Sequence, residues 1–164
     1  EEYNIKYEIE IENETDRVVC EYLWLSQKNI KELPDSIGNL NCITLNLSYN
    51  NIKELPESIG NLSCNYLDLE NNEIKELPDS IGNLKCERLD LSHNEIIELP
   101  NSIGNLRCDT LDLSNNLIPK SRIKYLERIE GLKYCSTDYS NNLYDIFKLC
   151  KMNLRRDKIE SILV

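Results

Sequence analysis

The sequence predicts a solenoid, a stack of short coils that each contain one parallel strand and one brief helical turn. The first observation is the segment Glu-Leu-Pro-x-Ser-Ile-Gly-Asn-Leu, which recurs with a period of 22 residues at Glu32, Glu54, Glu76 and Glu98. The second is a Leu-x-Leu triplet between the copies, which begins at Leu45, Leu67, Leu89 and Leu111. Because a fixed period in this range is typical of stacked repeats, it predicts the fold before any other feature.

Each Leu-x-Leu triplet predicts a short strand whose two leucines enter the core, since side chains in a strand alternate between its faces. An asparagine follows the triplet, at Asn50, Asn72, Asn94, Asn116 and, in a degraded copy, Asn142. We expect its amide to satisfy backbone groups that the inward turn leaves unpaired. The isoleucine two residues later is expected to point inward as well.

The second half of the unit predicts a thin outer side. Leu-Pro stops any helix, because proline fixes φ and lacks an N–H donor. Ser-Ile-Gly-Asn-Leu then predicts a 3-10 or single helical turn that buries isoleucine and leucine, with glycine permitting a tight exit.

The unit resembles the leucine-rich repeat, whose pattern is L-x-x-L-x-L-x-x-N-x-L followed by a variable half. Its variable half is most similar to intracellular repeat proteins of the Ras-associated, scaffold type. The resemblance covers roughly residues 20–118 and implies an α/β fold, a right-handed horseshoe with short parallel strands on its concave side. One departure is cysteine at the first leucine position, in Cys20, Cys42, Cys64, Cys86 and Cys108. A smaller side chain at a tighter corner explains this departure.

The chain is expected to form one continuous domain with two unlike ends, because a solenoid must cover its terminal coils. Residues 1–19 alternate apolar and polar side chains, which predicts a strand or hairpin cap. Residues 20–118 contain the repeats. Residues 119–164 predict an irregular last repeat, with Thr137 in the position of Leu111, and a helical cap.

The resemblance implies that the non-leucine strand positions bind a partner on the concave face. The candidate partner-binding residues are Tyr22, Trp24, Thr44, Asn46, Tyr49, Tyr66, Asp68, Glu70, Arg88, Asp90, His93, Thr110 and Asp112. The aromatic members are the strongest, because aromatic and arginine side chains dominate interface energetics. Trp24 and Tyr22 could instead pack under the N-terminal cap.

Charge indicates the class of partner. The net charge is −10, and residues 20–119 carry 16 acids against 7 bases. Such a body repels nucleic acid and anionic membranes and attracts a basic protein segment, although acidity also serves solubility alone. No stretch approaches ~20 apolar residues, so we expect no membrane span, and no signal peptide is recognised.

The cysteines predict a reducing, cytoplasmic setting. Five of the seven recur at one core position, where a free thiol packs as a small apolar group. A disulfide ladder or a soft-metal ladder remains the alternative. No C-x-x-C pair is present, which argues against zinc.

No catalytic constellation is recognised, and we expect no enzyme activity, metal or cofactor. His93 is the only histidine, and it occupies a variable position. A row of aspartates on the strand face could hold a cation or act as acid and base. It consists of Asp68, Asp90, Asp112 and Asp138, and we expect no pocket around it.

The predicted function is therefore a protein-interaction module, either a monomer or a weak homodimer. Two alternatives stay open. One is a self-associating structural protein, and the other is a recognition subunit that acts with a separate catalytic protein.

Overall fold

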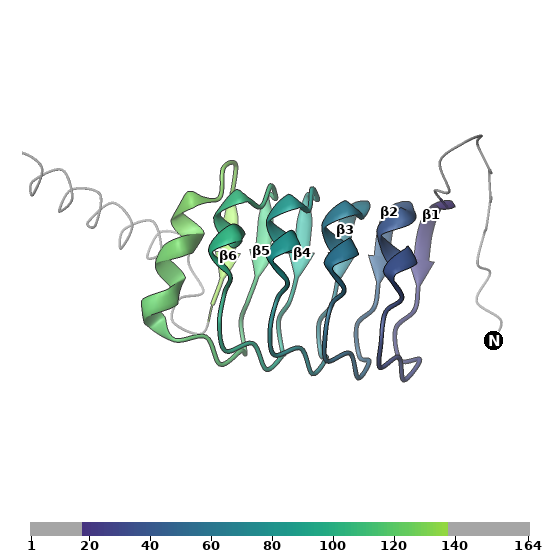
Figure 1. Ribbon diagram of the computed structural model, residues 1–164, viewed down its shortest axis with the longest axis horizontal. Helices are drawn as coiled ribbons and strands as arrows, with labels where there is room; N and C mark the ends of the chain where they lie inside the picture. The colour runs from purple at the N-terminus through teal and green to yellow at the C-terminus, as the bar shows by residue number, and fades with distance from the viewer. Residues whose placement is uncertain (1–17, 138–164) are drawn as a thin grey trace, which may run out of the picture.

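The computed structural model describes residues 18–137, so the predicted caps before and after them lie outside the described residues. One parallel sheet runs through this part of the chain in the order β1-β2-β3-β4-β5-β6 (Figure 1). The strands are β1 (Val18–Trp24), β2 (Leu40–Asn46), β3 (Ser63–Asp68), β4 (Arg88–Asp90), β5 (Thr110–Asp112) and β6 (Tyr134–Ser136). Sequential strands are neighbours throughout, as the repeat predicts.

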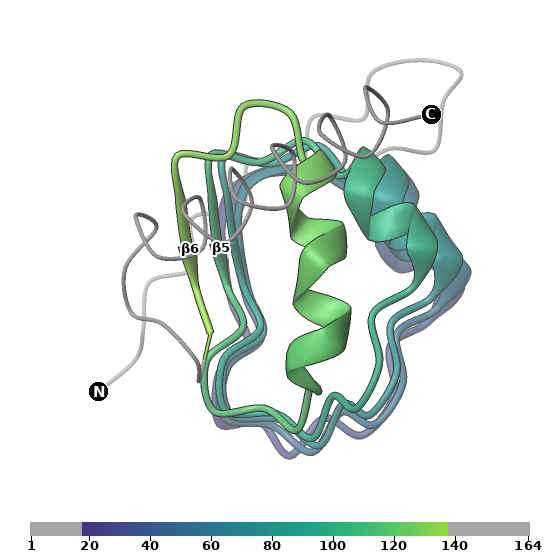
Figure 2. The ribbon, with the colours of Figure 1, turned by 90° about the vertical axis from the view of Figure 1, so that its left-hand side faces the viewer.

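Short 3-10 helices form the opposite side of each coil, which confirms the predicted thin outer side. They are η1 (Asp35–Asn39), η2 (Glu57–Asn61), η3 (Asp79–Asn83), η4 (Asn101–Asn105) and the longer η5 (Lys120–Arg128). Each begins directly after a proline, for example Pro56 before η2. The end-on view shows sheet and helices on opposite sides of the coil (Figure 2).

The core lies between these two layers and consists of stacked, identical positions. Both leucines of each Leu-x-Leu triplet are buried, with Leu45, Leu67 and Leu89 fully inaccessible. The isoleucine after each asparagine turn is buried too, as are the isoleucines of η1 to η4. Cysteines align in the same way, because Cys20, Cys42 and Cys64 are direct neighbours across β1, β2 and β3.

The inward asparagines form the predicted ladder. The Asn94 amide nitrogen donates to the carbonyl oxygens of Leu69 at 3.0 Å and Leu91 at 3.1 Å, and its Oδ1 accepts from the Ile74 N–H at 3.0 Å. The same pattern is built by Asn50, Asn72 and Asn116. Each ladder asparagine therefore joins its own coil to the preceding one.

The repeated glycine has a different role from the one predicted. The glycines of η1 to η3 do not have positive φ angles. A Cβ on Gly60 would lie 2.3 Å from the Ser80 carbonyl oxygen, and Gly38 and Gly82 face the next helix in the same way. Glycine is therefore needed for close approach between neighbouring helices rather than for a special backbone conformation.

The last described repeat departs from the predicted alignment. Leu111 pairs with Cys135, and not with Thr137. Cys135 is fully buried there, because the longer η5 segment brings a small apolar side chain into the leucine position. Leu126 within η5 and Ile129 directly after it are buried against the core.

The sheet is open and uncurled over these repeats, and its parallel strands with short 3-10 turns opposite them confirm the predicted solenoid (Figure 1). The outer elements η1 to η4 are single 3-10 turns that approach one another closely at glycine.

Candidate interaction surface

The side chains that point away from the core on β1 to β6 form one continuous surface, which we call the sheet face. Its first column follows the register Tyr22, Thr44, Tyr66, Arg88, Thr110, Tyr134. Its second column follows Trp24, Asn46, Asp68, Asp90, Asp112, Ser136. The backbone register thus brings the predicted strand residues together on one surface.

Aromatic side chains gather at the β1 end of the sheet face. Tyr22 and Trp24 are 47% and 52% exposed, and Tyr49 is 51% exposed at the end of the next strand. Thr44 is buried because it lies between Tyr22 and Tyr66 in the register. Rigid aromatic groups that remain half in water on a sheet provide large contact area at low entropic cost.

A cluster of Tyr66, Arg88 and Asp90 occupies the middle of the sheet face. The Arg88 guanidinium carbon lies 4.8 Å from the centre of the Tyr66 ring, and its Nη2 lies 3.2 Å from Asp90 Oδ2. Burial raises the pKa of the Tyr66 hydroxyl to about 12, with help from the Asp68 carboxylate and against the effect of Arg88. The guanidinium is thus held over the ring and remains half exposed.

The aspartate column mainly caps the ends of its own strands. Asp90 Oδ1 accepts hydrogen bonds from the Ser92 N–H at 3.1 Å and the Ser92 hydroxyl at 2.6 Å. Asp112 holds Ser114 in the same way, and the neutral Asn46 holds Ser48. These side chains fix the turn that follows each strand, a local structural task that asparagine performs as well as aspartate.

Negative charge nevertheless collects beside the cluster. Burial raises the pKa of the Asp68 carboxyl, which is 6% exposed, and the neighbouring Asp90 adds to this rise. The Glu70 pKa is raised by burial and by repulsion from Asp90 and Asp68. Arg88 is the cation that the structure places against this group, so the middle of the sheet face remains acidic.

Tyr49 and His93 occupy turn positions rather than strand positions. Their φ angles are +55° and +53°, as in the equivalent Asn71 and Asn115. Asparagine and histidine tolerate this left-handed region better than a bulky tyrosine does. The His93 ring nitrogen Nε2 lies 3.0 Å from Asn115 Nδ2, which links the turns of two neighbouring coils.

Comparison with known proteins assigns these repeats to a family. The family described as Leucine Rich Repeat matches three successive units, residues 41–62, 63–84 and 85–106. Residues 41–106 of the chain are leucine-rich repeats. A solved leucine-rich repeat protein from Leptospira interrogans is 27% identical with a TM-score of 0.44, and the likeness covers 70% of this chain but 43% of that one. No curated protein matches the chain.

The leucine-rich repeats carry one sheet-face residue that the sequence analysis missed. Tyr134 is 41% exposed and pairs with Thr110, so it extends the column of Tyr22 and Tyr66. The sequence had predicted that Thr137 aligns with Leu111, and this alignment does not place Tyr134 in the column. The sequence signal was the triplet Tyr134-Cys-Ser. It predicts a strand if a cysteine can occupy the first leucine position of the Leu-x-Leu triplet.

Other chemistry is not assembled in the described repeats. No group of three or more histidine, cysteine, aspartate or glutamate side chains between residues 18 and 137 has a metal-binding arrangement. The same part of the chain contains no helix that combines the length and apolar character of a membrane span. Thr110 and Asp112 are partly accessible.

Proposed function

We propose that this chain is a non-catalytic interaction module that binds a protein partner through the sheet face. Leucine-rich repeats generally mediate protein–protein interaction. The observation that carries the proposal here is the exposed aromatic group of Tyr22 and Trp24 on the parallel sheet and Tyr49 in the turn beside it. Aromatic side chains of this kind become interface anchors when a partner removes them from water.

The chemistry of the proposed partner follows from the acidic middle of the sheet face. Burial and the charges of Asp90 and Asp68 raise the pKa of the Glu70 carboxyl, and burial and Asp90 raise that of Asp68. A lysine or arginine of the partner would relieve this repulsion, which favours a segment that combines basic and apolar side chains.

The experiment compares partner capture by the wild type and by a Tyr22→Ala/Trp24→Ala variant and a Glu70→Lys variant. These positions are accessible, whereas Asp90 is 6% exposed and supports Ser92, so a lysine there would disturb the strand end. Glu54→Lys is the matched control, because Glu54 is exposed on the outer loop. We expect both sheet-face variants to lose the partner and the control to retain it. Equal recovery by all three variants would refute binding through the sheet face.

Self-association is the second candidate, and one observation favours it. Lys53 pairs with Glu73 and Lys75 pairs with Glu95, each across a spacing of twenty residues on the outer loop. The next equivalent pair is Ile97 and Leu117, which are 49% and 65% exposed. An apolar pair in place of an ion pair is the kind of patch that a second copy could cover.

Sedimentation separates this candidate from the first. If the chain self-associates through this pair, Ile97→Lys/Leu117→Glu restores the ion pair and yields a monomer at concentrations where the wild type dimerises. A wild type that sediments as a monomer at every concentration removes self-association.

We also propose a reducing, cytoplasmic location. The support is that the cysteine column lies in the core, where burial raises the pKa of Cys86 and Cys108 to about 12. Such thiols are suited to apolar packing rather than to redox exchange.

A further inference from the structure

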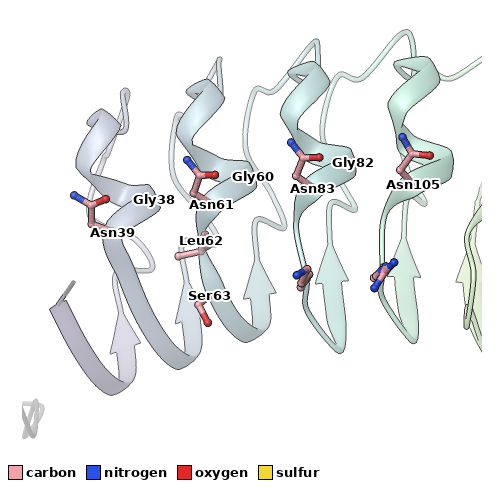
Figure 3. A pocket seen from close by; sticks show the side chains of 11 residues that line it. Gly38, Asn39, Gly60, Asn61, Leu62, Ser63, Gly82, Asn83 and Asn105 are labelled. Carbon is pink, nitrogen blue, oxygen red and sulfur yellow. The ribbon is translucent and has the colours of Figure 1, made fainter. Parts of the chain in front are cut away.

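A polar groove crosses four repeats at the corner where the 3-10 helices turn into the strands. Its volume is about 860 Å³, and it extends from Gly38 and Asn39 to Asn105 and Arg107. Figure 3 shows that its labelled asparagines come from equivalent places in neighbouring coils. This corner lies outside the sheet face, and the proposed function does not use it.

The outer wall of the groove is a row of four carboxamides, formed by Asn39, Asn61, Asn83 and Asn105. Each is the last residue of its helix, and each is exposed. Within residues 18–137 none of the four makes a side-chain hydrogen bond, in contrast to the buried ladder asparagines. Every carboxamide therefore offers two donors and one acceptor oxygen to a ligand.

The glycines Gly38, Gly60 and Gly82 also line the groove. Their missing Cβ atoms let each helix approach the next one closely. The glycines therefore keep the asparagines of neighbouring helices close together along the row.

Positive charge lies at one end of the groove. Lys85 and Arg107 are direct neighbours in the strand register, and both are exposed without an ion-pair partner in the described repeats. A second hollow of about 420 Å³ continues past Arg107 to Arg128 and Glu130. On a chain of net charge −10, the adjacent Lys85 and Arg107 form a local site for anions.

We propose that this groove binds an extended acidic segment of a partner protein. The carboxamides pair with the main-chain amides of the segment, because a carboxamide and a peptide group present matching donors and acceptors. Aspartate or glutamate side chains of the segment contact Lys85 and Arg107. The row spans three strand spacings of ~4.8 Å, which matches about four to five extended residues.

The lining of the groove distinguishes a peptide from other elongated ligands. No aromatic side chain lines it, so it has no stacking surface for the bases of a single-stranded nucleic acid. A peptide needs no such surface, since its hydrogen-bonding groups recur every ~3.3 Å along an extended chain. The sheet face and the groove would then receive segments of opposite charge.

The test is fluorescence anisotropy with an eight-residue Gly/Asp peptide as the probe. A Gly/Lys peptide of equal length tests the charge, and polyacrylate tests whether carboxylates without peptide groups suffice. We expect the acidic peptide alone to bind, and Lys85→Glu/Arg107→Glu to weaken it by at least about tenfold. Asn61→Ala/Asn83→Ala is expected to weaken it as well, while net charge stays unchanged.

The controls separate the groove from the sheet face. Arg88→Ala and Tyr22→Ala/Trp24→Ala leave binding of the acidic peptide unchanged if it occupies the groove. The proposal is overturned if the basic peptide or polyacrylate binds as tightly as the acidic peptide. It is also overturned if Asn61→Ala/Asn83→Ala leaves the affinity for the acidic peptide unchanged, or if Arg88→Ala abolishes its binding. None of these outcomes bears on partner capture by the sheet face, so the two proposals fail separately.

Discussion

At the scale of the residue, asparagine performs two opposite tasks in this chain. Asn94 is 7% exposed, and its amide connects three carbonyl oxygens and one N–H from two coils. Asn83 is exposed and makes no side-chain hydrogen bond within the described repeats. The same side chain is thus a structural cross-link in the turn and a group available to ligands in the groove.

This contrast predicts very different costs for the same substitution. Asn94→Ala leaves buried backbone groups without partners, and we expect it to lower the free energy of unfolding by about 3 kcal/mol or more. Asn83→Ala is the matched control and should change it by less than about 0.5 kcal/mol. Urea denaturation followed by circular dichroism measures both, and equal losses would contradict the ladder.

Residue-level prediction from the sequence succeeded where each coil repeats the same contact. The ladder asparagines were predictable because an inward turn must satisfy its backbone groups in every copy. The capping role of Asp90 was not, since it depends on the local geometry of the Ser92 turn. Tyr134 was missed because the longer η5 segment shifts the strand register in a way that no periodicity encodes.

At the scale of the element, neighbouring 3-10 helices are spaced by glycine. Gly60→Ala would place a Cβ 2.3 Å from the Ser80 carbonyl oxygen. Overpacking of this kind typically costs about 1–3 kcal/mol, and we expect a loss near the upper end because a backbone atom cannot move aside. Asn61→Ala, one residue later and exposed, is the control for the same denaturation measurement. If Gly60→Ala leaves the free energy of unfolding unchanged, the helices can move apart without cost and the close approach is not required.

The acidic group between β3 and β4 predicts a pH dependence. Because burial and the neighbouring aspartates raise the Glu70 pKa, the folded state holds this proton more tightly than the unfolded state does. The unfolding free energy contributed by Glu70 therefore rises as the pH falls towards its pKa and is lowest at neutral pH. Asp68 acts with the same sign.

Glu70→Gln removes the charge and keeps an acceptor for Asn71 Nδ2, which lies 2.8 Å from Glu70 Oε1. We expect it to stabilise the fold by about 0.5 kcal/mol at pH 7 and by much less near pH 4. Glu76→Gln serves as the control on an exposed outer loop. A gain of equal size at both pH values would exclude charge repulsion as the cause.

At the scale of the whole molecule, a column of cysteines runs along the core of the stack. The described cysteines are buried, and burial raises the pKa of Cys20 to about 11. Cys150 lies outside the described residues, so a Cys150→Ser variant isolates the six others. We expect these six thiols to resist a thiol reagent in the native state and to react fully after denaturation without reductant. Fewer than six reactive thiols after denaturation would reveal disulfides.

The stack as a whole was largely predictable, because four nearly identical units determine strand order and core. The close approach of its outer helices was not, since it depends on contacts such as that of Gly60 with Ser80. The groove was also missed. Its asparagines belong to the most constant segment of the repeat, which the sequence analysis assigned to structure alone.

We propose that the sheet face, built from positions that vary between copies, binds the partner. The sharpest test is hydroxyl-radical footprinting of the chain, free and bound to its captured partner, because Tyr22, Trp24 and Tyr66 are readily oxidised reporters on that face. We expect partner binding to protect these three side chains and to leave the exposed Ile97 and Leu117 as reactive as before. If Trp24 and Tyr66 are oxidised equally in the free chain and in the complex, the partner does not bind the sheet face.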